Sequence, residues 1–286
     1  MAQKWNRPTG LATMWMCGAL ASFLLMGVGG RELAGVLTTF QILFFRSLIG
    51  LIVASVIVGR TGWKQLQTDQ FGWHVLRNVA HYGGQYGWFY GLGFIPLAEV
   101  FAIEFTVPIW VALLAVFILG ERLTRSRMAA IGLGFVGFLV ILRPGLEVIH
   151  PAALAVLGAA IGYAIAHTLT KKLTATDSAW SVVFYMTMIQ LPFGLIPSLW
   201  NWATPTAADW PWLILVGIAA LTAHYCMSRA LALADATVVV PMDFLRLPLV
   251  ALVGAVFYDE PLDWLVLVGA ALMLFGNWIN IWWERK

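Results

Sequence analysis

Long runs of apolar residues, separated by short breaks rich in Gly, Pro and charged residues, follow one another along the whole chain. A transmembrane helix needs roughly 20 mostly apolar residues. Stretches of about that length cover residues 9–28, 35–58, 71–92, 97–119, 125–143, 151–171, 178–199, 210–233, 236–257 and 262–283. The breaks leave no room for an extramembrane domain, so the pattern predicts an all-α integral membrane protein with ten transmembrane helices.

The second half of the chain repeats features of the first half at an offset of about 139–140 residues. Gln85 in the third stretch corresponds to His224 in the eighth, and Glu104 in the fourth corresponds to Asp243 in the ninth. An odd number of spans in each half makes the second copy enter the membrane from the opposite side. We therefore expect two inverted five-helix repeats, residues 1–145 and 146–286, around a central cavity, an arrangement typical of secondary transporters.

Composition excludes a soluble or disordered protein. Hydrophobic residues make up 61% of the chain and charged residues 11%, with a mean hydropathy of +0.84. A soluble domain carries about 25% charged residues, so this chain lacks the polar surface that water requires. The net charge of +3 is too small to indicate a nucleic-acid partner.

Lysine and arginine are distributed unevenly between the breaks. If the N-terminus is cytoplasmic, only Arg31 and Arg143 lie outside. The cytoplasmic side then holds Lys4, Arg7, Arg60, Lys64, Arg122, Arg125, Arg127, Lys171, Lys172, Arg229, Arg285 and Lys286. Positive residues favour the cytoplasmic side of a membrane. The pattern predicts cytoplasmic N- and C-termini in a bacterial-type inner membrane.

Motifs for enzymes, cofactors and metals are absent from the sequence. Cys17 and Cys226 lie in separate apolar stretches, and neither HExxH, GxSxG nor a P-loop occurs. We expect no catalytic residues, no metal, no cofactor and no ATP hydrolysis by this chain, so that transport energy comes from gradients. A monomer is compatible with these features.

Two corresponding segments carry a family resemblance. Pro108, the apolar run to residues 120–124 (Gly-Glu-Arg-Leu-Thr) and the glycine-rich residues 130–137 resemble the EamA-type repeat of the drug/metabolite transporter superfamily. Residues 248–262 resemble its second copy, with Asp259 in place of a glycine. Within the superfamily the chain is most similar to YddG-type exporters of aromatic and other neutral amino acids. The resemblance implies ten helices, inside termini and export of small metabolites.

The third stretch carries an unusually polar stripe. His74, Arg77, His81, Gln85 and Trp88 follow one another at helical spacing. Such a face is costly against lipid and is expected to line the protein interior. We take His81 and Gln85 as candidate ligands for the polar groups of a solute; interhelical hydrogen bonding is the alternative. His74 and Arg77, near the cytoplasmic end, are expected to reach the membrane surface by snorkelling.

Charged residues in other stretches supply further candidates. Arg46 is the deepest cation and is expected to bind a substrate carboxylate. Glu104 and Asp243 are the candidates for proton coupling. Asp243 lies three residues before Arg246, so we expect these two to form a salt bridge. Glu104 has no cation one turn away in its own stretch, and Arg46 is one possible partner from another helix.

Aromatic residues complete the expected substrate site. Tyr82, Tyr86, Trp88 and Tyr163 are assigned to the solute's side chain, and His224 joins His81 and Gln85 as a polar ligand. This set suits an amino acid with an apolar or aromatic side chain better than a phosphate compound, which needs several converging cations.

Glycines at helical spacing indicate close helix contacts. Gly83, Gly87 and Gly91, and likewise Gly158 and Gly162, have the small-xxx-small spacing of packed membrane helices. Residues 132–137 match the dinucleotide fingerprint in letters, but no strand precedes them, so helix packing is expected there too.

These observations predict a secondary transporter that exports aromatic or neutral amino acids, or related small metabolites, by alternating access. We expect the solute to equilibrate without obligatory proton exchange. One alternative is an exporter of lipophilic cations. Another is a membrane-embedded enzyme acting on lipid-linked substrates, with His81 or Glu104 as the base.

Overall fold

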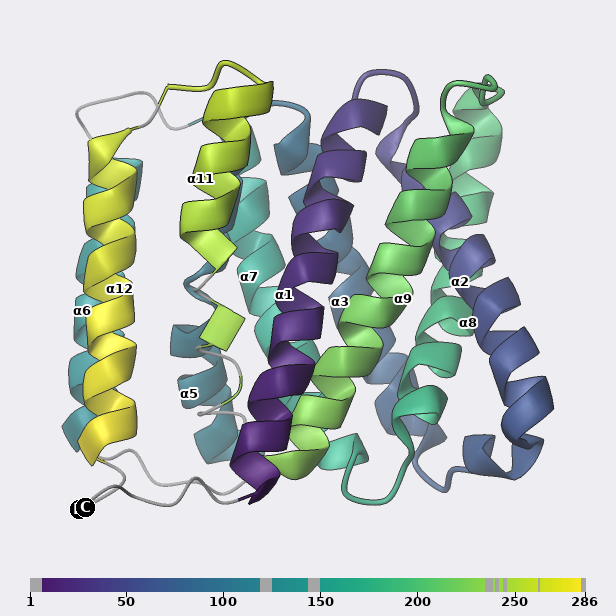
Figure 1. Ribbon diagram of the computed structural model, residues 1–286, viewed down its shortest axis with the longest axis horizontal. Helices are drawn as coiled ribbons and strands as arrows, with labels where there is room; N and C mark the ends of the chain where they lie inside the picture. The colour runs from purple at the N-terminus through teal and green to yellow at the C-terminus, as the bar shows by residue number, and fades with distance from the viewer. Residues whose placement is uncertain are drawn as a thin grey trace.

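The computed structural model describes residues 7–118, 125–143, 150–234, 239, 242–243, 246–261 and 263–283. In this part of the chain every regular element is helical, as predicted, and the long helices stand side by side in one bundle (Figure 1). The α-helices are α1 (Arg7–Leu33), α2 (Thr39–Thr61), α3 (Phe71–Leu92), α4 (Leu97–Glu104), α5 (Val107–Ile118), α6 (Arg125–Leu142), α7 (Pro151–Leu173), α8 (Ala179–Ser198), α9 (Trp210–Leu233), α11 (Arg246–Phe257) and α12 (Trp264–Trp283). Two short 3₁₀ helices, η1 (Trp63–Leu66) and η2 (Leu199–Asn201), follow α2 and α8.

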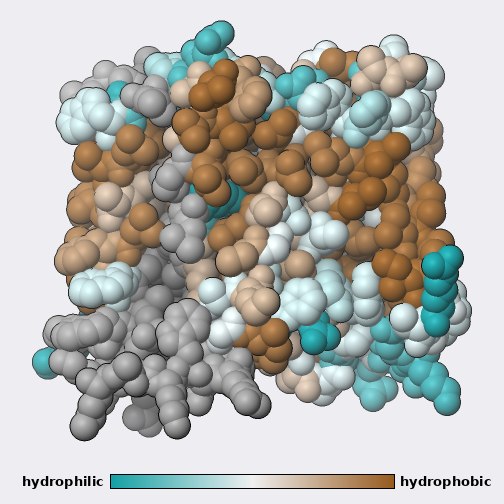
Figure 2. Space-filling model, viewed as in Figure 1, coloured by the Kyte–Doolittle hydropathy of each residue, from teal (hydrophilic) through white to brown (hydrophobic). Residues whose placement is uncertain are grey.

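On the face shown in Figure 2, the described surface is apolar around its middle and more polar towards its two ends. Large apolar side chains such as Phe117 and Phe257 are 84% and 75% exposed, which only a lipid surrounding makes favourable. Stretches of the described chain that are long and apolar enough to cross a membrane are Gly10–Leu33, Thr39–Thr61, Leu97–Ile118, Pro151–Leu173, Ala179–Asn201 and Trp210–Leu233. Two shorter apolar helices cover Ile131–Ile141 and Trp264–Gly276. The chain is therefore a multispan membrane protein.

The first helix is longer than the sequence predicted. We expected it to end at residue 28, but α1 continues through Gly29 and Gly30 to Leu33. A Cβ at Gly29 would lie 2.7 Å from the Val216 side chain, and one at Gly30 would lie 2.8 Å from Phe89. These glycines permit close helix packing and do not end the helix.

The fourth expected span is two helices. α4 ends at Glu104 and α5 begins at Val107. Pro108 has no N–H to donate to the carbonyl of Glu104 one turn earlier, which breaks the helix at that point. α11 likewise begins at Arg246 with a proline, Pro248, in its first turn. Each half of the chain thus places a proline near the start of a helix, four or five residues after a carboxylate (Glu104 or Asp243), and our sequence prediction missed this break.

Helices of the first half pack mainly against helices of the second half. The pairs are α1 with α9, α2 with α8, α3 with α7, α4 with α11, and α6 with α12. Every pair joins one half of the chain to the other. The interface between the halves therefore runs through the centre of the bundle.

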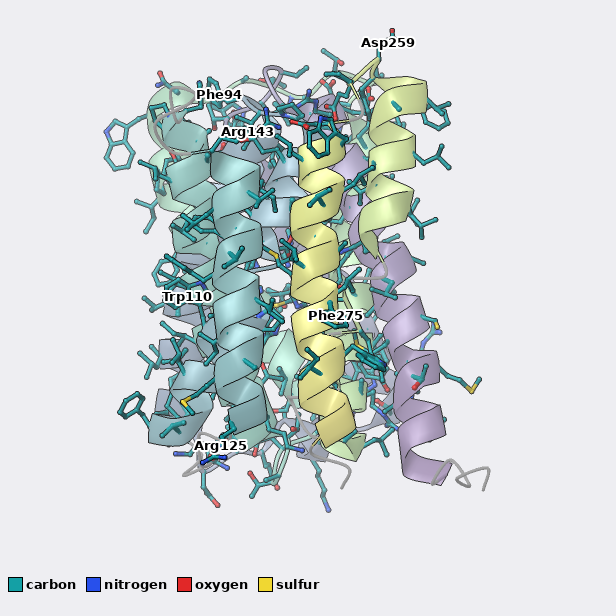
Figure 3. All side chains as sticks on the ribbon, turned by 90° about the vertical axis from the view of Figure 1, so that its left-hand side faces the viewer. Phe94, Trp110, Arg125, Arg143, Asp259 and Phe275 are labelled. Atoms are coloured by element: carbon teal, nitrogen blue, oxygen red, sulfur yellow. The ribbon has the colours of Figure 1, made fainter. Side chains whose placement is uncertain are left out.

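The ends of the described chain lie on one side. α1 begins and α12 ends at the same end of the bundle (Figure 1). Arg125, at the start of α6, lies at that end, whereas Phe94, Arg143 and Asp259 lie at the opposite end (Figure 3). The predicted motif residues 120–124 and residue 262 fall outside the described residues.

Close contact between α3 and α7 depends on particular glycines. A Cβ at Gly87 would lie 2.4 Å from the Ala155 carbonyl oxygen, and one at Gly162 would lie 2.7 Å from the Ala80 carbonyl oxygen. A Cβ at Gly83 or Gly158 would meet no atom within 4 Å. The predicted packing role is therefore confirmed at Gly87 and Gly162 and is wrong for Gly83 and Gly158, because these face outward on the same helices.

Candidate functional site

A small cavity lies at the centre of the interface between the two halves. Three charged residues line it, Glu104, Asp243 and Arg246, together with the aromatic residues Phe23, Trp88 and Tyr163. Gln85, His167, His224 and Met26 complete its wall. Its volume is about 20 Å³, which is room for about one water molecule. No amino-acid-sized solute fits in this conformation.

The polar stripe of α3 faces this centre, as its spacing predicted. His74, Arg77, His81, Gln85 and Trp88 are each at most 2% exposed. They are buried because α3 packs its polar face against α7 and α8 and leaves its apolar face outside.

A chain of hydrogen bonds runs along the stripe. The Gln85 side-chain nitrogen lies 2.6 Å from His81 Nδ1, and the Gln190 side-chain nitrogen lies 2.9 Å from the same atom. Gln190 also donates to Asn78 Oδ1 at 3.2 Å, and Arg77 donates to that oxygen at 2.7 Å. The alternative assignment for His81 and Gln85, hydrogen bonding between helices, therefore holds in this closed conformation, in which α8 supplies Gln190.

Arg46 enters this network from α2. It is 1% exposed, and its Nη1 donates to Gln85 Oε1 at 3.0 Å. Its Nε and Nη2 atoms are buried without a hydrogen-bond partner, and no described carboxylate forms a salt bridge with it. Buried donors are rarely left unsatisfied, and a buried unpaired charge is costly. The Nε and Nη2 donors of Arg46 are therefore available to bind an acceptor from a solute.

Glu104, Asp243 and Arg246 form a second charged group. Arg246 Nη2 lies 2.5 Å from Asp243 Oδ2 and 3.1 Å from Glu104 Oε1. Trp88 Nε1 donates to the other Glu104 oxygen at 2.7 Å. The predicted Asp243–Arg246 salt bridge is confirmed. The suggestion that Arg46 pairs with Glu104 is wrong, because α11 brings Arg246 to Glu104 across the interface.

Aromatic and imidazole rings lie between the two charged groups. The His81 ring centroid is 4.6 Å from that of His224 and 5.5 Å from that of Tyr163. His224 also packs edge-on against Phe23, with 5.3 Å between centroids. The predicted residues His81, Tyr163 and His224 thus meet at the centre although they come from α3, α7 and α9.

Arg46 and His81 contact residues of the cavity wall without lining it themselves, and two further predicted site residues, Tyr82 and Tyr86, also lie outside the wall. Tyr82 donates its hydroxyl to the Phe193 carbonyl at 2.9 Å and packs against that ring. Tyr86 packs on Phe40, with 4.6 Å between ring centroids, and is stacked with Tyr90. Neither lines the central cavity in this conformation, so a contact of either with solute remains a prediction.

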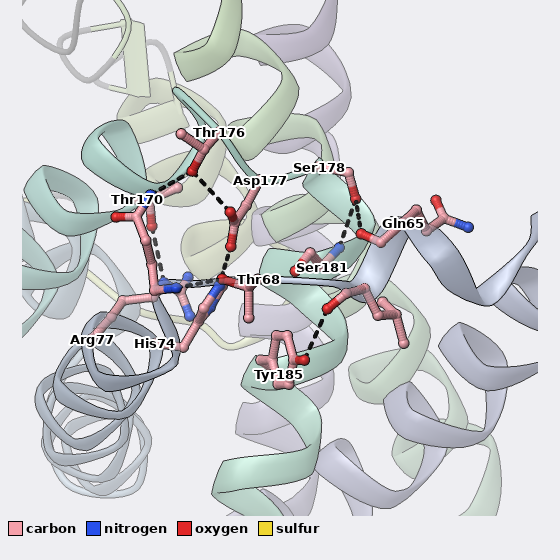
Figure 4. Close-up of polar contacts among 12 residues, drawn as sticks. Gln65, Thr68, His74, Arg77, Thr170, Thr176, Asp177, Ser178, Ser181 and Tyr185 are labelled. Carbon is pink, nitrogen blue, oxygen red and sulfur yellow. Dashed lines mark hydrogen bonds and ion pairs between the residues drawn. The ribbon is translucent and has the colours of Figure 1, made fainter.

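One end of the bundle is closed by contacts between the α2–α3 and α7–α8 connections (Figure 4). His74 Nε2 lies 2.7 Å from Asp177 Oδ2, and Arg77 Nε donates to Thr170 Oγ1 at 2.9 Å. Tyr185 and Ser178 donate to backbone carbonyls of Leu66 and Gln65. The prediction that His74 and Arg77 snorkel to the surface is wrong, since both are buried in this layer.

The Asp177 carboxyl is well stabilised as an anion. Burial acts to raise its pKa, but hydrogen bonds from Thr68, His74 and Thr176 outweigh it and hold the pKa below the usual value. A cavity of about 720 Å³ lies among the same loops, lined by Trp63, Leu66 to Gln70, Thr176, Asp177 and Tyr185.

The opposite end is closed by Arg31 and Glu260. Arg31 donates to Glu260 at 2.9 Å and to the carbonyls of Leu92 and Ile95. The second Glu260 oxygen accepts from the backbone N–H of Leu97 at 2.9 Å. Burial raises the pKa of Glu260, opposed by Arg31 and by the N–H groups at the start of α4. Contacts between the two halves thus hold both ends of the bundle together.

Several central residues escaped the sequence prediction. Arg246 was set aside because its neighbour Asp243 accounted for its charge, and Gln190 and Asn78 were not considered. A glutamine inside the apolar stretch 178–199 is a signal that could have found Gln190. Among the described residues, no group of three or more His, Cys, Asp or Glu could hold a metal ion.

Comparison with known proteins identifies relatives along the full chain. The EamA-like transporter family matches residues 10–143 and again residues 150–282. The S-adenosylmethionine uptake transporter of Rickettsia prowazekii is 27% identical over 95% of this chain and 92% of its own length. The riboflavin transporter of Vibrio cholerae is 31% identical over 83% of this chain and 81% of its own length. The pseudopaline exporter of Pseudomonas aeruginosa is 27% identical over 91% of this chain and 92% of its own.

A solved crystal structure shares the fold. It superimposes with a TM-score of 0.73 over 96% of this chain and 97% of the other, at 17% identity. At that identity the likeness concerns the fold alone.

Proposed function

Because the chain belongs to the EamA-like transporter family, and is thus a membrane transporter and not an enzyme, we propose that it carries amino-acid-type solutes across a bacterial-type inner membrane by alternating access. Export of aromatic or neutral amino acids is the form of this activity that the sequence predicts. Relatives include both an uptake transporter and an exporter. The direction in the cell then follows the solute gradient.

Arg46 is the observation that carries this proposal. It is a buried cation with two unpaired donors, and its third nitrogen bonds to Gln85, which lines the cavity. The planar guanidinium binds a carboxylate through two parallel hydrogen bonds. S-adenosylmethionine, which the Rickettsia relative carries, has an α-amino carboxylate, whereas riboflavin has none. The arrangement around Arg46 therefore favours a carboxylate-bearing solute over riboflavin.

Ten spans in two inverted repeats would explain the contacts between the halves. With an offset of about 140 residues, exchange of the halves converts the α1–α9 pair into the α3–α7 pair and leaves the α2–α8 and α6–α12 pairs unchanged. Lys171 donates to the carbonyls of Leu231 and Ala234, which lie 139 residues after the two carbonyls that Arg31 contacts. Equivalent contacts at opposite ends support a two-fold axis in the membrane plane.

Alternating access then requires opening one closed end at a time. Separation of Arg31 from Glu260 would open one side, and separation of His74 from Asp177 would open the other. Each opening enlarges a centre that is too small for solute when both are closed.

Counterflow in proteoliposomes tests the proposed substrate class. We expect preloaded phenylalanine to drive accumulation of labelled phenylalanine, with competition by S-adenosylmethionine and little competition by riboflavin. Counterflow supported by riboflavin but by no amino acid would contradict the proposal.

A lipophilic-cation exporter is the second candidate, because Glu104 and Asp243 share only one guanidinium. Tetraphenylphosphonium in the same assay separates the two functions. Transport of this cation with no response to phenylalanine would favour the second.

Energy coupling is tested with the unmodified protein. We expect uptake that runs to equilibrium when no pH difference is present and a proton ionophore is added, because the interface does not need a titrating group to move. Accumulation above equilibrium driven only by an imposed pH step would show obligatory proton exchange.

The orientation can be tested by labelling single cysteines. In a chain whose Cys17 and Cys226 are replaced by alanine, Arg125→Cys and Lys172→Cys are expected to be shielded from an impermeant thiol reagent in intact cells. Asp209→Cys is expected to react, because its connection lies at the opposite end from the cytoplasmic termini. Labelling at position 172 in sealed cells would refute the topology.

A further inference from the structure

The carboxylates in the cavity wall outnumber the arginine that pairs with them. Glu104 and Asp243 both approach one nitrogen of Arg246, so two carboxylates share one guanidinium. Asp243 Oδ1 is buried and has no hydrogen-bond partner in the described structure. Arg246, 1% exposed, leaves its Nε and Nη1 atoms equally unsatisfied in the cavity wall. These three residues are therefore incompletely paired in the wall of the cavity.

The helix ends make the arrangement less favourable still. Glu104 lies in the last turn of α4, where the helix dipole is negative and disfavours a carboxylate. Arg246 opens α11, where the dipole is positive and disfavours a cation. Both residues lie on the wrong end of their helix and are held there by each other. A pair of this kind is easier to separate than one that the helix ends support.

Aromatic rings surround the guanidinium. Its Cζ lies 4.8 Å from the Phe23 centroid and 4.7 Å from the Phe101 centroid. Ring faces at this distance attract any cation. An ammonium or sulfonium group would gain the same rings and the same two carboxylates that now hold Arg246.

We propose that Glu104 and Asp243 form the subsite for the solute's cationic group, and that Arg246 occupies this subsite as a built-in substitute until the solute displaces it. The proposal rests on the proposed function, in which Arg46 takes the carboxylate. Gln85 lies between the carboxylate subsite and the cation subsite, because it bonds to Arg46 and lines the cavity with Glu104 and Arg246. The site thereby selects zwitterions.

Ligand-induced thermal stabilisation of the full-length protein in detergent tests the carboxylate subsite and the cation subsite separately. The ligands are L-phenylalanine, 3-phenylpropionate, which lacks the ammonium, phenethylamine, which lacks the carboxylate, and S-adenosylmethionine. The variants are Asp243→Asn, Glu104→Gln and Arg246→Met. Asp69→Asn, at an exposed carboxylate in the α2–α3 connection, is the matched control.

In the unmodified protein we expect L-phenylalanine to bind about tenfold more tightly than either analogue. Asp243→Asn and Glu104→Gln should weaken L-phenylalanine and phenethylamine by about tenfold and leave 3-phenylpropionate nearly unchanged. Arg246→Met should strengthen phenethylamine, because its internal competitor is gone. Asp69→Asn should match the unmodified protein with every ligand.

If Asp243→Asn weakened the binding of all ligands equally, Asp243 would have a structural role and the proposal would be overturned. Weaker binding of phenethylamine to a folded Arg246→Met protein would also overturn it. If Arg246→Met fails to fold, the double variant Asp243→Asn/Arg246→Met keeps the original net charge of the three residues. Its binding of phenethylamine, compared with that of Asp243→Asn, then shows whether loss of Arg246 strengthens binding. Binding of 3-phenylpropionate or riboflavin by the unmodified protein, with none of L-phenylalanine or S-adenosylmethionine, would refute the proposed function itself.

Discussion

Replacement of Arg46 by methionine is expected to lower phenylalanine counterflow by at least about 30-fold, which corresponds to roughly 2 kcal/mol of lost solute binding. The reason is that methionine fills a similar volume but offers no donor to the solute carboxylate. Arg46→Lys should recover only part of the activity, because a single ammonium cannot form the paired hydrogen bonds of a guanidinium.

The same substitution should leave the protein folded. Two donors of Arg46 are unsatisfied in the closed conformation, so their removal takes away a desolvation cost. We therefore expect Arg46→Met to keep or raise the melting temperature in detergent. Arg60→Met, at an exposed position near the end of the same helix, is the matched control and should transport normally. Normal transport by Arg46→Met would place the carboxylate site elsewhere.

Replacement of Gly87 by leucine is expected to abolish most of the folded yield. Even a Cβ at this position would lie 2.4 Å from the Ala155 carbonyl oxygen, so α3 and α7 would have to separate. Overpacking of a well-packed contact costs about 1–3 kcal/mol, and a backbone neighbour cannot yield as a side chain can. The measurement is the monodisperse fraction and melting temperature after purification.

Gly83→Leu is the control for that experiment. Gly83 lies one turn away on α3 and faces open space, so leucine there should be tolerated. Gly134 is an intermediate case, because the atom that its Cβ would meet, at 2.5 Å, is the flexible end of the Ile109 side chain. A folded Gly87→Leu protein with an intact α3–α7 contact would contradict the packing described for this pair.

Local features were predictable from the sequence. The lengths of the apolar runs gave helix positions close to those of α3, α6, α8 and α9, because lipid forces each run to satisfy its own backbone hydrogen bonds as a helix. The Asp243–Arg246 contact was predictable because both residues belong to one turn of sequence. The burial of His81 and Gln85 followed from the cost of placing polar groups against lipid.

Contacts between helices could not be predicted in this way. In a membrane protein the core and the lipid-facing surface are both apolar, so hydropathy along a helix does not show which face meets a neighbour. His74 was therefore expected at the surface, although Asp177, 103 residues away, holds it in the interior. The same uncertainty led us to name Arg46 as a possible partner of Glu104.

The sequence by itself determined that this is a helical membrane transporter with a repeated half, because apolar run length, charge distribution and the EamA motif are properties of the linear chain. Tertiary structure alone decided that Arg246 also pairs with Glu104 and that two donors of Arg46 are left without a partner. Which arginine reaches Glu104 depends on how α4, α11 and their neighbours are rotated about their helix axes. Close packing of glycines and aromatic rings at the interface sets this rotation, and such packing joins residues far apart in the sequence, for example Gly87 with Ala155 and His81 with His224.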